Sequence, residues 1–202
     1  MSTRVGILAY GSLIDDPGEE IDAAKTETIK DGVTTPFRVE FARTSKERAG
    51  APTLVPVNRD GAQVRAEILI LNVPEEEAAN RLYRREINMV GMREVVYHHR
   101  KNSGPNNVVV ERIENCHGVS VVLYTKIGAN IVNPTPQKLA ALAVESARRL
   151  DNGRDGITYL INAQRNGIAT PLSAEYEEEI KRLTGSRSLA EALENVHFGY
   201  SA

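Results

Sequence analysis

Apolar residues in the first 125 positions fall into short runs and two-residue alternations, both of which predict β-strands. At residues 37–42, Phe and Val alternate with Arg, Glu and Ala, the period of a strand with one buried face. Pro52 and Pro56 lack a backbone N–H, so the run between them is expected to be an edge strand or a corner. Further strands are expected at 7–9, 64–71, 94–98, 108–113 and 119–125. Several short strands separated by turns favour a sheet that curls towards a barrel.

The apolar period becomes helical from Thr135 onward. Thr135 before Pro136 is typical of a helix cap followed by the first turn. Two more helices are expected at 157–166 and 173–183, the second closed by Gly185, which suits a left-handed cap. We therefore predict a single α+β domain spanning 1–202, strand-rich over 4–125 and helical over 135–195, with helices packed on a curved sheet.

One long helix is predicted inside the strand-rich half. It begins at Pro74, carries glutamates at 75–77 in its first turn and arginines at 81, 84 and 85 near its end, an order that complements the helix dipole. Ala78, Leu82 and Glu86 recur every four residues and share one face. Glu86 thus occupies a position where the pattern calls for an apolar residue.

A carboxylate that points inward has two interpretations. It costs free energy unless it is paired or hydrogen-bonded, and an arginine of the sheet, such as Arg38 or Arg43, could satisfy it. Alternatively, burial shifts a carboxyl pKa towards the range useful for proton transfer near neutral pH. Spacing alone leaves both interpretations of Glu86 open.

The N-terminal strand runs into a corner of unusual composition. Ile7, Leu8 and Ala9 are followed by Tyr-Gly-Ser-Leu at 10–13, then by Asp16-Pro17-Gly18. A strand that turns at Gly11 could point backbone N–H groups into one concavity that suits a carboxylate. The same letters also fit an ordinary tight turn.

Composition narrows the classes of function. The chain has 202 residues, 41% hydrophobic and 26% charged, with a net charge of −2, so neither nucleic acid nor a membrane is expected as a partner. The single cysteine, Cys116, and the lack of a long apolar run or leader pattern predict a cytoplasmic protein. Cys116 and the four histidines lack zinc-ligand spacing, and no phosphate-binding glycine loop is present. No metal and no cofactor are expected.

The corner and the helix end together resemble the γ-glutamyl cyclotransferase-like family. Its members open with a strand followed by Tyr-Gly-Ser-(Asn or Leu), here "YGSL" at 10–13, and carry an essential glutamate on a later helix, here "LYRRE" at 82–86. The stretch "YLINAQRNGI" at 159–168 is similar to a closing helix of the family. Two positions depart from the pattern. Many relatives have Gly where this chain has Ile87, and the glutathione-specific branch has a tryptophan near residues 15–17.

The resemblance implies a fold, a reaction and a site. The fold would be a small curved mixed β-sheet or barrel with surrounding helices. The reaction would cyclise the γ-glutamyl group of a peptide, amine or conjugate to 5-oxoproline and release the amine. The resemblance makes Glu86 the acid/base, Tyr10, Gly11, Ser12 and Leu13 the grip on the α-carboxylate end, and Tyr124 and Tyr97 pocket-lining residues.

An alternative function on the same fold is a non-catalytic or regulatory protein that binds a small acidic metabolite. Either function implies a small-molecule partner. The sequence leaves the oligomeric state open, a homodimer included.

Overall fold

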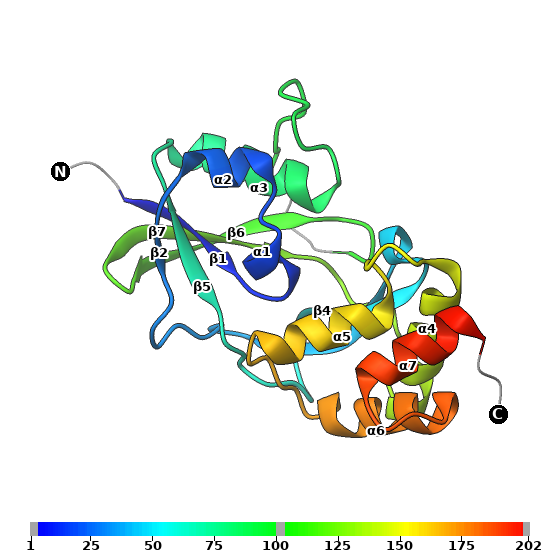
Figure 1. The fold of residues 1–202 in the computed structure, drawn as a ribbon. Helices are drawn as coiled ribbons and strands as arrows, with labels where there is room; N and C mark the ends of the chain where they lie inside the picture. Colours follow the sequence, from blue (N-terminus) through cyan, green and yellow to red (C-terminus); the bar gives the residue numbers. More distant parts are fainter. Residues whose placement is uncertain (1–3, 100–103, 200–202) are drawn as a thin grey trace. The chain divides into compact units, whose positions relative to one another are not determined.

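The computed structural model describes residues 4–99 and 104–199, which divide into two compact units (Figure 1). Unit 1 comprises Met1–Pro36 and Arg65–Gly128, and unit 2 comprises Phe37–Val64 and Ala129–Ala202. The strands predicted at 37–42 and between Pro52 and Pro56 therefore group with the C-terminal helices. Those predicted at 7–9, 64–71, 108–113 and 119–125 contribute to the sheet of unit 1.

Unit 1 contains a five-stranded mixed sheet in the order β2-β5-β1-β7-β6. Its strands are β1 (Val5–Ala9), β2 (Lys25–Ile29), β5 (Glu67–Leu71), β6 (Val109–Cys116) and β7 (Val119–Lys126). Strand β1 is parallel to β7 and antiparallel to β5. Because β2 and β6 are edges, the described part of the chain forms an open sheet and no closed barrel. The predicted α+β class with a mixed sheet is confirmed.

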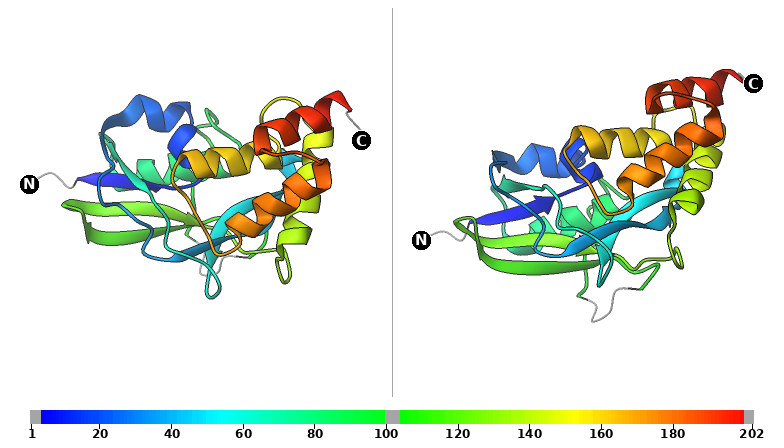
Figure 2. Two further views of the ribbon diagram at one scale, coloured as in Figure 1. Left: turned by 60° about the horizontal axis from the view of Figure 1, so that its bottom comes forward. Right: turned by 90° about the horizontal axis from the view of Figure 1, so that it is seen from below.

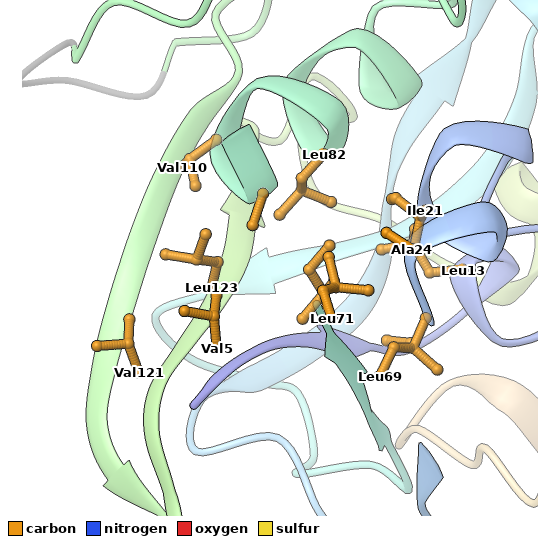
Figure 3. Packing of buried hydrophobic residues seen from close by; sticks show 13 residues of the cluster. Val5, Leu13, Ile21, Ala24, Leu69, Leu71, Leu82, Val110, Val121 and Leu123 are labelled. Carbon is orange, nitrogen blue, oxygen red and sulfur yellow. The ribbon is translucent and has the colours of Figure 1, made fainter. Parts of the chain in front are cut away.

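The described residues of unit 1 form three helices: α1 (Ser12–Asp15), α2 (Glu19–Ala24) and α3 (Glu75–Glu86). The predicted long helix is α3, which lies beside α2 and packs on β1 and β7 (Figure 1). Ala78 and Leu82 are fully buried, and Figure 3 shows Leu82 above Leu71 and Leu123 of the sheet. Burial of a leucine side chain contributes about 2 kcal/mol. The apolar face of α3 therefore fixes the end of the helix that carries Glu86.

Within its described residues, unit 2 forms a two-stranded sheet and four α-helices (Figure 2). Its elements are β3 (Arg38–Ser45), η1 (Lys46–Arg48), β4 (Ala51–Val57), α4 (Pro136–Arg149), α5 (Gly156–Arg165), α6 (Ser173–Thr184) and α7 (Leu189–Phe198). The Thr135 side chain accepts a hydrogen bond from the Lys138 N–H at the start of α4, and Gly185 ends α6 with φ 63°. In the described residues β4 pairs with β3 alone, which confirms the edge position predicted from its prolines.

The strand predicted at 94–98 is wrong. This segment is irregular because side chains, not a neighbouring strand, satisfy its polar groups: the Tyr97 N–H donates to Asn80 Oδ1 at 2.7 Å. The pattern also missed five elements: α1, α2, β2, η1 and α7. Strand β2, "KTETI", has no fully buried residue and so leaves no apolar alternation to detect.

A buried carboxyl joins two segments within unit 2. Glu40 of β3 is only 2% exposed, and its carboxylate accepts hydrogen bonds from the Thr170 hydroxyl at 2.6 Å, the Phe41 N–H at 2.8 Å and the Leu172 N–H at 3.3 Å. Burial raises the pKa of Glu40 above its ordinary value of 4.5, and these hydrogen bonds offset that rise only in part.

This raised pKa gives a pH-dependent contribution to stability. Between the ordinary and the raised pKa, the folded protein binds more protons than the unfolded chain, so stability falls as pH rises. We expect the free energy of unfolding of the wild type, relative to Glu40→Gln, to be greatest below pH 4.5 and to decrease above it. Urea unfolding of both proteins from pH 4 to pH 7 measures this difference. A difference that stays constant over that range would contradict the prediction.

Candidate active site

The Tyr-Gly-Ser-Leu corner is a strand-to-helix turn. Strand β1 ends at Ala9, and Gly11 caps α1 with φ 57° and ψ −132°, a conformation that glycine adopts at little steric cost. The N–H groups of Leu13 and Ile14 donate to the carbonyls of Tyr10 and Gly11 at 3.3 Å. Leu13 and Tyr10 are buried. The buried side chains of Tyr10 and Leu13, one before and one after Gly11-Ser12, fix the backbone position from which Ser12 projects.

Glu86 is the last residue of α3, and the helix end has a well-defined cap. The Met89 N–H donates to the Arg84 carbonyl at 2.8 Å and the Asn88 N–H to the Arg85 carbonyl at 3.2 Å, the hydrogen bonds of a Schellman motif. Asn88 takes the left-handed position with φ 59°, whereas Ile87 has φ −100°. Residue 87 therefore needs no glycine, because the reversal of the chain occurs one residue later.

Arg85 links Glu86 to the corner. Its Nη1 lies 2.8 Å from Glu86 Oε1, and its Nη2 donates to Ser12 Oγ at 3.1 Å. Its Nε and Nη2 also donate to the Asp16 carbonyl, at 3.1 and 2.7 Å. The corner and the helix end, 73 positions apart between Ser12 and Arg85, thus meet at one guanidinium.

The environment of Glu86 differs from a simple inward-facing carboxylate. Its side chain is 18% exposed and forms an ion pair with Arg85. An arginine thus pairs with the carboxylate, as the first interpretation expected of a sheet arginine such as Arg38 or Arg43. That arginine is its own chain neighbour. The most deeply buried charged side chain of α3 is Arg84, which is 2% exposed, a position that apolar periodicity did not indicate.

The two tyrosines predicted to line the pocket have other surroundings. The Tyr97 hydroxyl donates to the Val110 carbonyl at 3.3 Å and accepts the Val110 N–H at 2.9 Å, so it binds the backbone of β6. Tyr124 lies on β7 next to Leu123, which faces the core beneath α3. Because side chains alternate along a strand, Tyr124 points to the opposite face of the sheet. Burial and then the charge of Glu111 raise its pKa. No contact of either tyrosine described here reaches Ser12 or Glu86, and their pocket roles stay predictions.

A second charged cluster lies on the other side of α3. Arg84 Nε donates to Glu20 Oε2 at 2.8 Å, its Nη2 to Glu77 Oε1 at 3.3 Å and its Nη1 to the Val95 carbonyl at 3.1 Å. Burial lowers the pKa of Arg84, but the two glutamates outweigh it and raise the pKa above its ordinary value. A concavity of about 510 Å³ adjoins this cluster, lined by Glu19, Glu20, Ala23, Glu77, Arg81, Arg84 and Arg93. Arg84 and Glu86 are about 200° apart around the helix, so this concavity is separate from the corner.

An exposed apolar segment follows Glu86 and was not predicted from the sequence. Met89, Val90, Met92 and Val96 are 38–48% exposed. A Cβ added at Gly18 would lie 3.2 Å from Arg85 Cγ and 3.5 Å from Val90 Cγ2, so Val90 lies beside the Arg85 corner. The signal that could have revealed this segment is the run "NMVGM" at 88–92, which lies just beyond the helix yet fits neither a strand nor a helix period.

The described residues also bear on other kinds of site. No helix within 4–99 or 104–199 combines the length and apolar composition needed to cross a bilayer. In the same ranges, no three His, Cys, Asp or Glu side chains are grouped so that they could hold a metal ion. Burial raises the pKa of the Cys116 thiol, which makes it a poorer nucleophile near neutral pH.

Together, the mixed sheet, its covering helices and the strand-to-helix corner define a γ-glutamyl cyclotransferase-like fold. The particular solved structure that carries this comparison is a γ-glutamyl cyclotransferase specific to glutathione from yeast. Its match covers 90% of this chain and 99% of that chain, with a TM-score of 0.56 and 14% sequence identity. No protein-family profile matches the sequence, and no curated protein matches it either. The similarity is therefore one of fold.

Proposed function

We propose that this protein is a γ-glutamyl cyclotransferase-type enzyme that converts a γ-glutamyl peptide, amine or conjugate to 5-oxoproline and a released amine. The observation that carries this proposal is the Arg85 guanidinium, which binds Ser12 of the corner and Glu86 of α3 at once. The two segments that carry the sequence resemblance are thus neighbours, on the fold that this reaction class uses.

The reaction is an internal aminolysis. The α-amine of the γ-glutamyl group attacks its own side-chain carbonyl carbon, a new C–N bond closes the five-membered lactam, and the original amide C–N bond breaks. The attack is intramolecular, so holding the chain folded lowers the barrier. An α-amine has a pKa near ~8 and must lose a proton before attack. Glu86 would accept that proton and return it to the departing nitrogen.

The alternative function, binding of a small acidic metabolite without catalysis, has one observation in its favour. The ion pair between Arg85 and Glu86 at 2.8 Å engages the carboxylate that the reaction needs. A binding protein would use the same corner and leave that ion pair intact.

A panel of γ-glutamyl compounds separates the two functions. It should include glutathione, γ-glutamyl amino acids and γ-glutamyl amines. Apolar amines belong among them, because the exposed Met89, Val90 and Met92 lie only a few residues after Glu86. We expect at least one compound to release 5-oxoproline, detected by mass spectrometry. If calorimetry detects binding of a compound but none yields 5-oxoproline, the enzyme proposal fails and the binding function stands.

A further inference from the structure

We propose that Arg85 binds the α-carboxylate of the substrate in place of Glu86, and that this exchange of carboxylates frees Glu86 to act on the α-amine. The inference rests on the proposed function and extends it, since it assigns a substrate-binding role to a residue outside the Tyr-Gly-Ser-Leu corner. It also gives the Arg85–Glu86 ion pair a role in the reaction sequence.

The guanidinium is held in place from one side by backbone. Its Nε and Nη2 both donate to the Asp16 carbonyl, and its side chain is only 16% exposed. These bonds do not depend on Glu86 and would persist if the carboxylate moved away. Arg85 is therefore positioned by the chain between α1 and α2, independently of its ion pair.

The remaining contacts of Arg85 are the ones that a ligand could replace. Nη1 meets Glu86 Oε1 and Nη2 meets Ser12 Oγ, so the two terminal nitrogens point at a carboxylate and at a hydroxyl. A guanidinium binds a carboxylate through two parallel N–H donors. A substrate carboxylate beside Ser12 would offer the same kind of partner as Glu86.

Exchange of one carboxylate for another keeps the electrostatic cost small. A partly buried guanidinium is destabilising when it loses its anion, but here the substrate supplies a new one as Glu86 leaves. The α-amine is attached to the same carbon as the α-carboxylate. Glu86, displaced from Arg85, therefore stands near the group whose proton it must remove. Without substrate, the ion pair keeps Glu86 engaged.

Arg81 provides a matched control on the same helix. Its Nε lies 2.8 Å from Glu77 Oε1 and its Nη1 donates to the Glu20 carbonyl at 2.6 Å. Like Arg85, it pairs with a helix glutamate and clamps a backbone carbonyl of the α1–α2 region. Arg81→Gln therefore removes contacts of the same type without touching Ser12 or Glu86.

The test compares a substrate with its α-carboxamide analogue, which keeps the amine but lacks the carboxylate. Arg85→Gln should lower kcat/KM for the carboxylate substrate at least about 30-fold and change it less than about threefold for the analogue. Arg85→Lys should restore part of the lost kcat/KM. Arg81→Gln should have the same kcat/KM as the wild type for both substrates. An equal loss on both substrates would make Arg85 merely structural and overturn the proposal.

Binding gives a readout that does not require turnover. Glu86→Gln removes the competing carboxylate, so calorimetry should find that it binds the intact carboxylate substrate more tightly than the wild type does. The double variant with Glu86→Gln and Arg85→Gln should lose that increase in affinity. Unchanged affinity in both variants would refute the exchange even if the enzyme is active. If 5-oxoproline never forms but these affinity changes occur, the enzyme proposal fails while the role of Arg85 in binding holds.

Discussion

Glu86→Gln should reduce the release of 5-oxoproline by about 10²–10⁴-fold, the usual contribution of a general acid–base group. An amide of the same size keeps the shape of the site but cannot accept the ammonium proton or return it to the leaving nitrogen. The fold should survive, because Glu86 is the last residue of α3 and its one ion pair described here is with the adjacent Arg85. Steady-state assays with the best substrate of the panel measure the effect.

Glu76→Gln is the matched control for this experiment. Glu76 is an exposed residue in the first turn of the same helix, and its loss removes one carboxylate with at most about 1 kcal/mol of helix stability. We expect it to keep the wild-type rate, with the same circular dichroism spectrum as Glu86→Gln. If Glu86→Gln retained more than half of the wild-type activity, Glu86 would not be the acid/base.

Arg84→Met should destabilise the protein by about 3 kcal/mol, the largest effect on stability that we expect from one substitution. The variant keeps an unbranched side chain in the buried space but removes the donor to Glu20 and to the Val95 carbonyl. It also leaves Glu77 with Arg81 alone of its two arginine partners. The estimate is at the lower end for a broken buried ion pair, because the Glu77 side chain is 38% exposed and water partly replaces the lost interaction. Urea unfolding measures the change.

Arg112→Gln is the control for that loss. Arg112 pairs with Glu75 and Glu114, but its side chain is 50% exposed, and exposed ion pairs contribute about 0–1 kcal/mol. We expect its unfolding free energy to stay within about 1 kcal/mol of the wild type. A loss of the same size for both variants would show that burial of Arg84 is not the cause.

Apolar periodicity and the backbone preferences of single residues predicted the elements that depend on interactions between neighbours in the sequence. The apolar stripe and charge order of residues 74–86 predicted α3, which begins at Glu75, one residue after the expected start at Pro74. The Thr135 cap, the Gly185 cap and the proline-marked edge strand β4 followed from backbone preferences of single residues. The segment at 94–98 failed because its polar groups are satisfied by Asn80, a partner that strand propensity does not encode.

In the candidate site, too, some features follow from the sequence and others from tertiary contacts. The sequence by itself determined the glycine at the corner, the helix that carries Glu86 and the positions whose resemblance points to γ-glutamyl chemistry. Only the tertiary structure decided that Ser12 and Glu86 share the Arg85 guanidinium and that Arg84 is the buried charge of the helix. Helical periodicity gives the direction of a side chain but not its partner. The partner depends on which distant segment the sheet brings alongside.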